Sequence, residues 1–387
     1  MAIKKIITRD FVLCFFAQFA FSSVFFTLIP TIPIYLSRLG STEAEIGVLV
    51  GTLSVSSLFL RPLVGRALLK ISERDFMIVG NLLYAFSSIA YLIAKPFWPF
   101  LIVRILQGIG LAFFATASFT LVSRISPEGH RGESLSYFYL AINTAFALAP
   151  SFWMALVNHF DFPILFIVCI GFSLASLFIT LKLDRRRIDP SEDPFVQNQS
   201  YLSREALPSS IMSFMGSFIW GAMTAFFPLF ALNYGVTNPG FFFAAVAITL
   251  ILGRGLGGKI LDIYAREKIL LPCLIAQIVA MIILAFSTTL PMFILVAVIW
   301  GLGIAFFYPT LVAYALDLAG PSRGPAIGTY MALGDFGAGI GSVIMGIILQ
   351  LSNYMVMFLC LSFIGIVNLF YFLLHIRKKG NRSHANL

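Results

Sequence analysis

Long apolar runs alternate with short polar segments along almost the whole chain. A helix needs about 20 apolar residues to cross the hydrocarbon core of a bilayer, and its backbone polar groups must then be satisfied within the helix. The pattern therefore predicts twelve transmembrane helices, at residues 10–37, 43–69, 76–94, 97–123, 132–157, 161–182, 207–233, 238–260, 268–287, 290–316, 325–350 and 354–376.

One long polar interval, at residues 183–206, interrupts this alternation. It contains charges of both signs and two prolines, and it lies near the middle of the 387-residue chain. We therefore expect an all-α membrane protein of two pseudo-symmetric six-helix bundles, at 1–182 and 207–376, joined by this linker and followed by a basic tail at 377–387.

Composition indicates the same class of protein. Hydrophobic residues make up 59% of the chain and charged residues 11%, and the mean hydropathy is +0.94. Soluble globular proteins average about 25% charged residues. The composition therefore excludes a soluble globular protein.

The distribution of positive charge predicts the orientation. Lys and Arg occur throughout the loops of one side, whereas the opposite loops contain only Arg38 and Lys95. Since positively charged loops face the cytoplasm, both termini and the linker are predicted to be cytoplasmic, in what we expect to be a bacterial inner membrane. The net charge of +9 is explained in this way without a nucleic-acid partner.

Cysteine, histidine and glycine patterns argue against an enzyme. The four cysteines are scattered singly through apolar runs, and the four histidines, at or beyond the ends of the predicted spans, lack metal-ligand spacing. The glycine-rich runs lie in or beside apolar spans and lack the Gly-Lys-Ser/Thr sequence of a nucleotide-binding loop. We expect neither catalytic nor metal-binding residues, and no cofactor.

The chain also contains an internal repeat. Arg61 stands four residues before Gly65, and Arg254 stands four residues before Gly258, 193 positions later. Thr-Leu-Val likewise recurs at 120 and 310. The repeat predicts that the two bundles are copies of one six-helix unit.

Several motifs give the chain a resemblance to the major facilitator superfamily over its whole length. Gly258, Asp262 and Arg266 resemble the family's loop after the second span, in which Asp follows Gly by four residues and basic residues come next. RILQGIG (104–110) resembles the Arg-x-x-Gln-Gly motif of drug-efflux-type members. AFALAPS (145–151) keeps the proline of the antiporter motif, with alanines in place of its glycines.

The resemblance implies a secondary active transporter with a central cavity between its two bundles. We expect export of a small organic molecule, such as a drug, a metabolite or a siderophore-like chelator, by proton antiport through alternating access. The resembled branch is proton-coupled efflux, and the protein is expected to act as a monomer in the lipid bilayer. The alternatives are proton-coupled uptake of a nutrient or metabolite and, more remotely, a non-transporting receptor or scaffold.

The repeated loop is interpreted as a conformational latch. Glycines allow helices to approach closely, an acid is favoured near a helix N-terminus, and basic residues anchor a loop at the headgroups. In the first copy Leu69 stands where the resemblance implies an acid. The alternative is a static turn that only sets topology. The predicted latch residues are Gly65, Lys70, Arg74, Arg254, Gly258, Asp262 and Arg266.

Asp335 is the only acid placed deep in a predicted span, about 16 Å from the cytoplasmic side. Arg61 lies about 13 Å inside the second span, and the resemblance implies that the second and eleventh spans are neighbours. Asp335 is therefore either a proton carrier with a raised pKa or one half of an inter-bundle ion pair with Arg61.

Polar and aromatic residues of the spans that line the cavity in the resembled fold are candidates for substrate contact. Arg104 either faces the cavity, where it would attract an anionic substrate, or turns to Gln107 and braces the bundle. The predicted cavity residues are Gln18, Arg104, Gln107, Asn143, Trp220, Trp300 and Tyr308.

Overall fold

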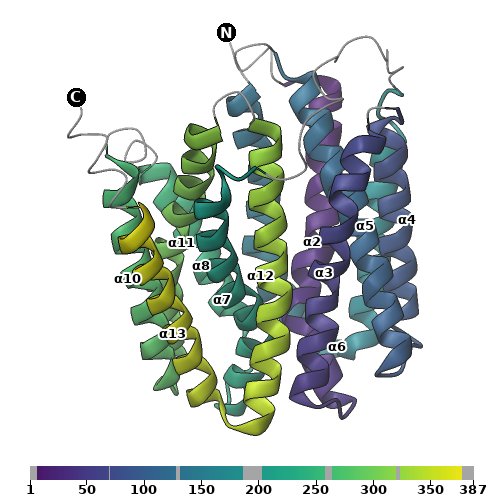
Figure 1. Cartoon of the computed structure of the whole chain (residues 1–387). Helices are drawn as coiled ribbons and strands as arrows, with labels where there is room; N and C mark the ends of the chain where they lie inside the picture. Colours follow the sequence, from purple (N-terminus) through teal and green to yellow (C-terminus); the bar gives the residue numbers. More distant parts are fainter. Residues whose placement is uncertain are drawn as a thin grey trace, which may run out of the picture. The chain divides into compact units, whose positions relative to one another are not determined.

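The computed structural model of the chain describes residues 7–68, 70–127, 131–185, 203–257, 264–319 and 323–376. The first half contains α2 (Arg9–Arg38), α3 (Glu43–Ala67), α4 (Glu73–Ala90), α5 (Trp98–Ile125) and α6 (Arg131–Thr180). The second half contains α7 (Leu207–Asn233), α8 (Gly240–Gly257), α10 (Arg266–Ala285), α11 (Leu290–Ala319), α12 (Arg323–Leu351), α13 (Tyr354–Tyr371) and the π-helical turn η2 (Phe372–Ile376) (Figure 1). The described residues form no strand, and the predicted all-α class is confirmed.

The fifth and sixth predicted spans form one element, α6, which is interrupted at Asp161. This residue has φ 66° and ψ 173°, a conformation that is nearly restricted to glycine, so it ends one helix and begins the next. Its carboxylate lies 3.5 Å from Arg38 Nη1, and the Arg38 guanidinium lies 5.1 Å from the centre of the Phe162 ring. With this break, the described chain has the twelve helical segments that the sequence predicts.

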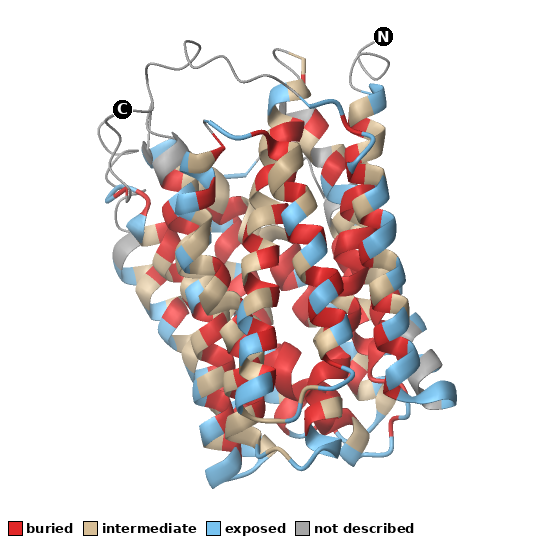
Figure 2. Ribbon diagram, turned by 90° about the vertical axis from the view of Figure 1, so that its right-hand side faces the viewer, coloured by how far each residue is buried: buried red, intermediate tan, exposed pale blue. Residues whose placement is uncertain are grey.

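Nine helical segments of the described chain are long and apolar enough to cross a membrane. In α8 only Gly240–Gly253 is apolar, which is short of a full span. Large apolar side chains such as Phe59, Ile93 and Phe178 are exposed, and exposed positions recur along the outer helix faces (Figure 2). These side chains are exposed because the outer faces contact lipid, where an apolar side chain does not meet water.

The chain forms two compact units. The first comprises Met1–Ser41 and Thr52–Val196, and the second comprises Thr42–Gly51 and Gln197–Leu387. The predicted linker is described only at 183–185 and 203–206, and the tail 377–387 lies outside the described residues. The predicted domain limits therefore stay predictions.

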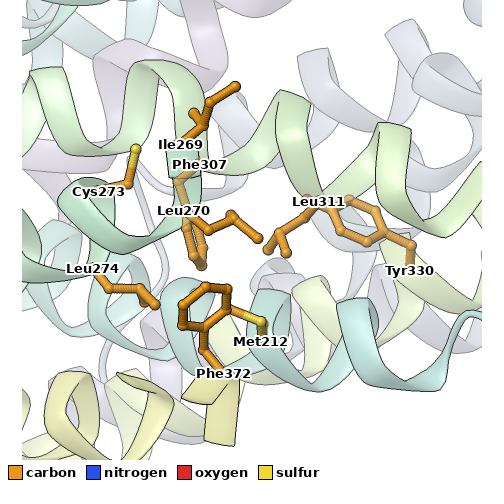
Figure 3. Packing of buried hydrophobic residues seen from close by; sticks show 9 residues of the cluster. All are labelled: Met212, Ile269, Leu270, Cys273, Leu274, Phe307, Leu311, Tyr330 and Phe372. Atoms are coloured by element: carbon orange, nitrogen blue, oxygen red, sulfur yellow. The ribbon is translucent and has the colours of Figure 1, made fainter. Parts of the chain in front are cut away.

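Each unit is held by a small number of extensive helix pairs. In the first unit α2 packs along α6, and α4 packs against both α5 and α6. In the second unit α7 packs along α12, α8 packs against α11, and α10 packs against α11 and α13. Figure 3 shows a core cluster of the second unit, formed by Met212, Ile269, Leu270, Cys273, Leu274, Phe307, Leu311, Tyr330 and Phe372.

One glycine contact between helices recurs at the spacing of the internal repeat. A Cβ atom built on Gly108 would lie 2.6 Å from the carbonyl oxygen of Leu53, so α3 and α5 touch at this glycine. The same contact recurs 193 positions later, where a Cβ atom on Gly301 would lie 3.3 Å from the carbonyl oxygen of Val246. Both halves therefore use one glycine-dependent contact at equivalent positions.

The α7–α12 pair shows how closely the backbones approach. A Cβ atom on Gly337 would lie 2.2 Å from the carbonyl oxygen of Phe214, and one on Gly341 would lie 2.2 Å from that of Phe218. Because lipid gives little hydrophobic driving force for helix association, such close backbone contact supplies the packing energy.

Replacing Gly341 by Leu should therefore destabilise the second unit by at least the roughly 1–3 kcal/mol typical of overpacking. Thermal unfolding in detergent measures this as a lower melting temperature. Gly171→Leu is the matched control, because nothing lies within 4 Å of a Cβ atom at that helical glycine. Equal melting temperatures for the two variants would contradict the packing argument.

Candidate functional site

The α5 motif RILQGIG builds a buried polar cluster in the first unit. Arg104 and Gln107 are three residues apart on one helix face and are only 5% and 1% exposed. Arg104 Nη1 donates a 2.8 Å hydrogen bond to Gln107 Oε1, and the hydroxyl of Tyr91 donates a 2.5 Å bond to the same oxygen. Arg104 also hydrogen-bonds the Tyr91 hydroxyl. The predicted bracing role of Arg104 includes this contact with Gln107. Both predicted roles of Arg104, bracing the bundle and facing the cavity, stay predictions.

The two glycines of the motif bring neighbouring helices onto α5. Gly108 accommodates Leu53 of α3, as described above. Gly110 accommodates α4, since a Cβ atom there would lie 3.0 Å from Tyr84 Cδ2 and 3.1 Å from the carbonyl oxygen of Gly80. The motif therefore combines a polar pair with the two contacts that place α3 and α4 beside it.

Tyr84 is a member of this cluster that the sequence reasoning missed. It is fully buried, and its ring lies 4.1 Å from the ring of Phe21. Its hydroxyl has no hydrogen-bond partner within the described part of the chain. The available sequence signal was its position seven residues before Tyr91, about two helical turns along one face of α4 and its C-cap.

Gln18 forms a second polar connection in the first unit. Its Nε2 donates to Ser22 Oγ at 2.8 Å, and its Oε1 accepts from Ser118 Oγ at 2.8 Å, which links α2 to α5. Asn143 lies on α6 and is partly buried. The structure thus connects Gln18 to the helix that carries Arg104.

The second unit brings its predicted aromatic residues together. The rings of Trp220 and Trp300 stack with centroids 5.5 Å apart and an interplanar angle of 27°, and Phe242 continues the stack on Trp300. Trp300 is 1% exposed, and its Nε1 has no acceptor among the described residues. Tyr308 hydrogen-bonds Ser217 and so connects α11 to α7.

Arg61 belongs to the first unit and Asp335 to the second. Arg61 Nε donates to Ser57 Oγ at 3.2 Å within α3. Asp335 lies partly buried on α12, and its Oδ2 is enclosed by protein. Their predicted pairing stays a prediction.

The predicted latch residues are only partly described. Arg74 Nη2 donates to the carbonyl oxygen of Leu181 at 2.7 Å, whereas Gly65 and Lys70 are exposed. The backbone of Arg254 belongs to α8. Gly258 and Asp262 lie outside the described residues. The latch itself therefore stays a prediction.

The sequence reasoning missed two ion pairs, which lie at positions related by the internal repeat. In the first unit Arg124 Nη1 lies 2.5 Å from Glu73 Oε1, with Glu73 buried at the start of α4. In the second unit Arg266 Nε lies 3.4 Å from Asp317 Oδ2. Arg266 lies 193 positions after Glu73, and Asp317 lies 193 positions after Arg124. The acid and the base have therefore exchanged places between the two units. An acid at a helix N-terminus is thus present in the first unit, at Glu73 rather than at position 69.

The described residues contain no group of three or more His, Cys, Asp or Glu side chains that could hold a metal ion. The described clusters of each unit instead offer hydrogen-bond donors and aromatic rings. Such groups bind and orient small molecules.

Comparison with known proteins identifies relatives over most of the chain. The family model described as Major Facilitator Superfamily matches residues 14–288 and 231–386. The staphylopine export protein of Staphylococcus aureus (strain Mu50) is 24% identical over 370 residues, which are 92% of this chain and 91% of that protein. The quinolone resistance protein NorA of Staphylococcus aureus (strain COL) is 24% identical over 339 residues, 82% of this chain and 84% of that protein.

Solved structures share the fold. The nucleoside transporter NupG has a TM-score of 0.76 at 16% sequence identity, covering 95% of this chain and 98% of that one. A POT family transporter in complex with a thioalcohol-conjugated peptide has a TM-score of 0.79 at 12% identity, covering 96% of both chains.

Gln107→Leu should destabilise the first unit, because it removes the oxygen that accepts from Arg104 and Tyr91. A buried donor left without its acceptor costs roughly 1–3 kcal/mol, and more for a charged group. Melting temperature in detergent is the measurement. Gln277→Leu is the control, since that buried glutamine has an Nε2 without a partner among the described residues. A control that loses as much stability as Gln107→Leu would contradict this account.

The reversed ion pair predicts that the charges of Glu73 and Arg124 can be exchanged. Glu73→Arg and Arg124→Asp should each cost up to roughly 3–5 kcal/mol, because each replaces one partner of the pair by a like charge and Glu73 is buried. The double variant copies the arrangement of Arg266 and Asp317 and should recover most of the loss in melting temperature. Additive losses in the double variant would show that the pair does not couple.

Proposed function

Because the chain belongs to the Major Facilitator Superfamily, we propose that it is a secondary active transporter that exports a small organic molecule by proton antiport through alternating access. The chain is a transporter rather than an enzyme. The observation that carries the export proposal is the similarity, over more than four-fifths of both chains, to a staphylopine export protein and a quinolone resistance protein. The proposed cargo class is a drug, a metabolite or a siderophore-like chelator.

Asp335 is the proposed proton carrier. A carboxyl group in a membrane span is costly to charge, so it binds a proton readily when its surroundings are dry and releases it when water reaches it. This chemistry suits antiport, since the proton and the cargo can then occupy the protein in turn. In the alternative role, Asp335 forms an ion pair with Arg61 that holds one conformation.

The proposed cargo contacts come from both units. Arg104, Gln107 and Gln18 offer hydrogen bonds, and Trp220, Trp300 and Tyr308 offer aromatic surface, with Asn143 as a further polar contact. The protein is proposed to act as a monomer in the inner membrane of a bacterium, with both termini in the cytoplasm. The proton gradient is the proposed energy source, and no bound cofactor is required.

Transport in proteoliposomes tests the antiport proposal. With an acidic lumen, antiport should accumulate a quinolone or staphylopine inside the vesicles, and nigericin should abolish the accumulation. Asp335→Asn should lose the response to the pH gradient, whereas Asp161→Asn, which changes an exposed acid in the α6 turn, should retain it. Accumulation only with an acidic exterior would indicate uptake by symport, and full coupling in Asp335→Asn would exclude its proton-carrier role.

A further inference from the structure

The C-terminal end of α6 is fixed to two other helices of the first unit. The last carbonyl groups of a helix have no acceptor role within the helix, and the negative end of its dipole favours cations. Arg74 Nη2, in the first turn of α4, donates to the carbonyl oxygen of Leu181 at 2.7 Å. Arg9 Nη2, at the start of α2, donates to the carbonyl oxygen of Lys182 at 3.3 Å. The Leu183 side chain is only 2% exposed, so the chain is firmly held as far as this residue.

The next two residues are exposed and form ion pairs with the same two helices. Asp184 Oδ1 lies 3.7 Å from Arg9 Nη1 on α2. Arg185 Nη2 lies 2.9 Å from Asp75 Oδ2 on α4. Three of these four side chains are 70% or 71% exposed, and Asp75 is 33% exposed. Exposed ion pairs contribute little, because water screens both charges and two long side chains lose freedom, so these contacts are weaker than the anchor at Leu183.

The second copy of the repeat lacks this charge complementarity. The positions 193 residues after the four paired residues offer no opposite charges, since they are occupied, in the order Arg9, Asp75, Asp184 and Arg185, by Leu202, Lys268, Arg377 and Lys378. In the first unit this place is where the chain enters the predicted linker, whereas in the second it is where the predicted tail begins. The pairs therefore belong to the start of the linker rather than to the helix ends that the two units share.

We propose that Asp184 and Arg185 form a detachable strap, which fixes the start of the linker to α2 and α4 and releases it when the two ion pairs open. With the strap attached, the linker begins after Arg185, and with the strap released it begins after Leu183. Release therefore adds two residues, about 7 Å of extended chain, to the connection between the two units. The strap acts whatever the cargo and the coupling ion are.

The weakness of the two pairs is what makes the strap detachable. An exposed ion pair favours the attached state only about 1.4- to 5-fold. The attached and released states thus differ little in free energy, and such an equilibrium is shifted by small changes in its surroundings. Ionic strength is the most direct of these changes, because the Debye length falls to about 3 Å at 1 M salt.

Zero-length cross-linking of the purified full-length protein in detergent tests the strap. In the Arg185→Lys variant a carbodiimide joins the new amine to the Asp75 carboxyl group as an amide, with loss of water, only when the two groups are in contact. Mass spectrometry of the digested protein identifies and quantifies this cross-link. It should form at low ionic strength, and its initial rate should fall up to about fivefold at 1 M salt, the full contribution of an exposed pair.

Two further substitutions in the Arg185→Lys background show whether both pairs hold one strap. Arg9→Gln removes the neighbouring pair and should slow the cross-link to Asp75 about 1.4- to 5-fold, because both pairs stabilise the same two linker residues. Lys95→Gln is the matched control, since it removes the same charge beyond the opposite end of α4, and it should leave the rate unchanged. Every substituted side chain is exposed, so the variants should fold as the wild type does.

Three outcomes would overturn the proposal. Absence of the cross-link at low ionic strength would exclude the strap, and an unchanged rate at 1 M salt would show a permanent contact instead of a detachable one. Equal rates in the Arg9→Gln and Lys95→Gln variants would show that the two pairs act separately. Coupling of glycine ethyl ester to the exposed Asp161 measures the direct effect of salt on the reagent, and all rates are corrected for it.

Discussion

Close contact between helix backbones is the constraint on which both units depend. In lipid the hydrophobic effect does little to hold helices together, so they must approach until backbone atoms touch. Gly108 and Gly110 permit this on two sides of α5, and Gly337 and Gly341 permit it between α7 and α12. A side chain at any of these positions would meet a carbonyl oxygen or a packed ring. In the first unit the Gly110 contact brings α4 against α5, the helix that carries Arg104 and Gln107.

The two copies of the internal repeat share a helix contact but differ in their polar and charged side chains. The contacts of Gly108 recur at Gly301, while the ion pair of Glu73 and Arg124 recurs with reversed charges at Arg266 and Asp317. An ion pair tolerates reversal because its energy depends on the product of the two charges, whereas a backbone contact tolerates no added atom. The two units have thus kept one scaffold and acquired different interiors, cationic in the first and aromatic in the second.

The two interiors offer different kinds of contact to a small molecule. Stacked rings accept planar apolar surface, and a buried arginine accepts an anion. A charge exposed to lipid is costly, so Arg104 is buried, whereas apolar side chains occupy the exposed surface. The division of chemistry between the units follows from their sequences, since Ala297 stands at the position equivalent to Arg104.

The sequence by itself determined the class, the helices and the repeat, because the length of an apolar run and the spacing of glycines follow directly from bilayer thickness and close packing. It also indicated Arg104 with Gln107, since residues three apart share a helix face. Only the tertiary structure showed that Tyr84 and Tyr91 join them and that Glu73 pairs with Arg124. Those contacts join residues distant in the chain, and nothing in local periodicity specifies which face of α4 meets α5.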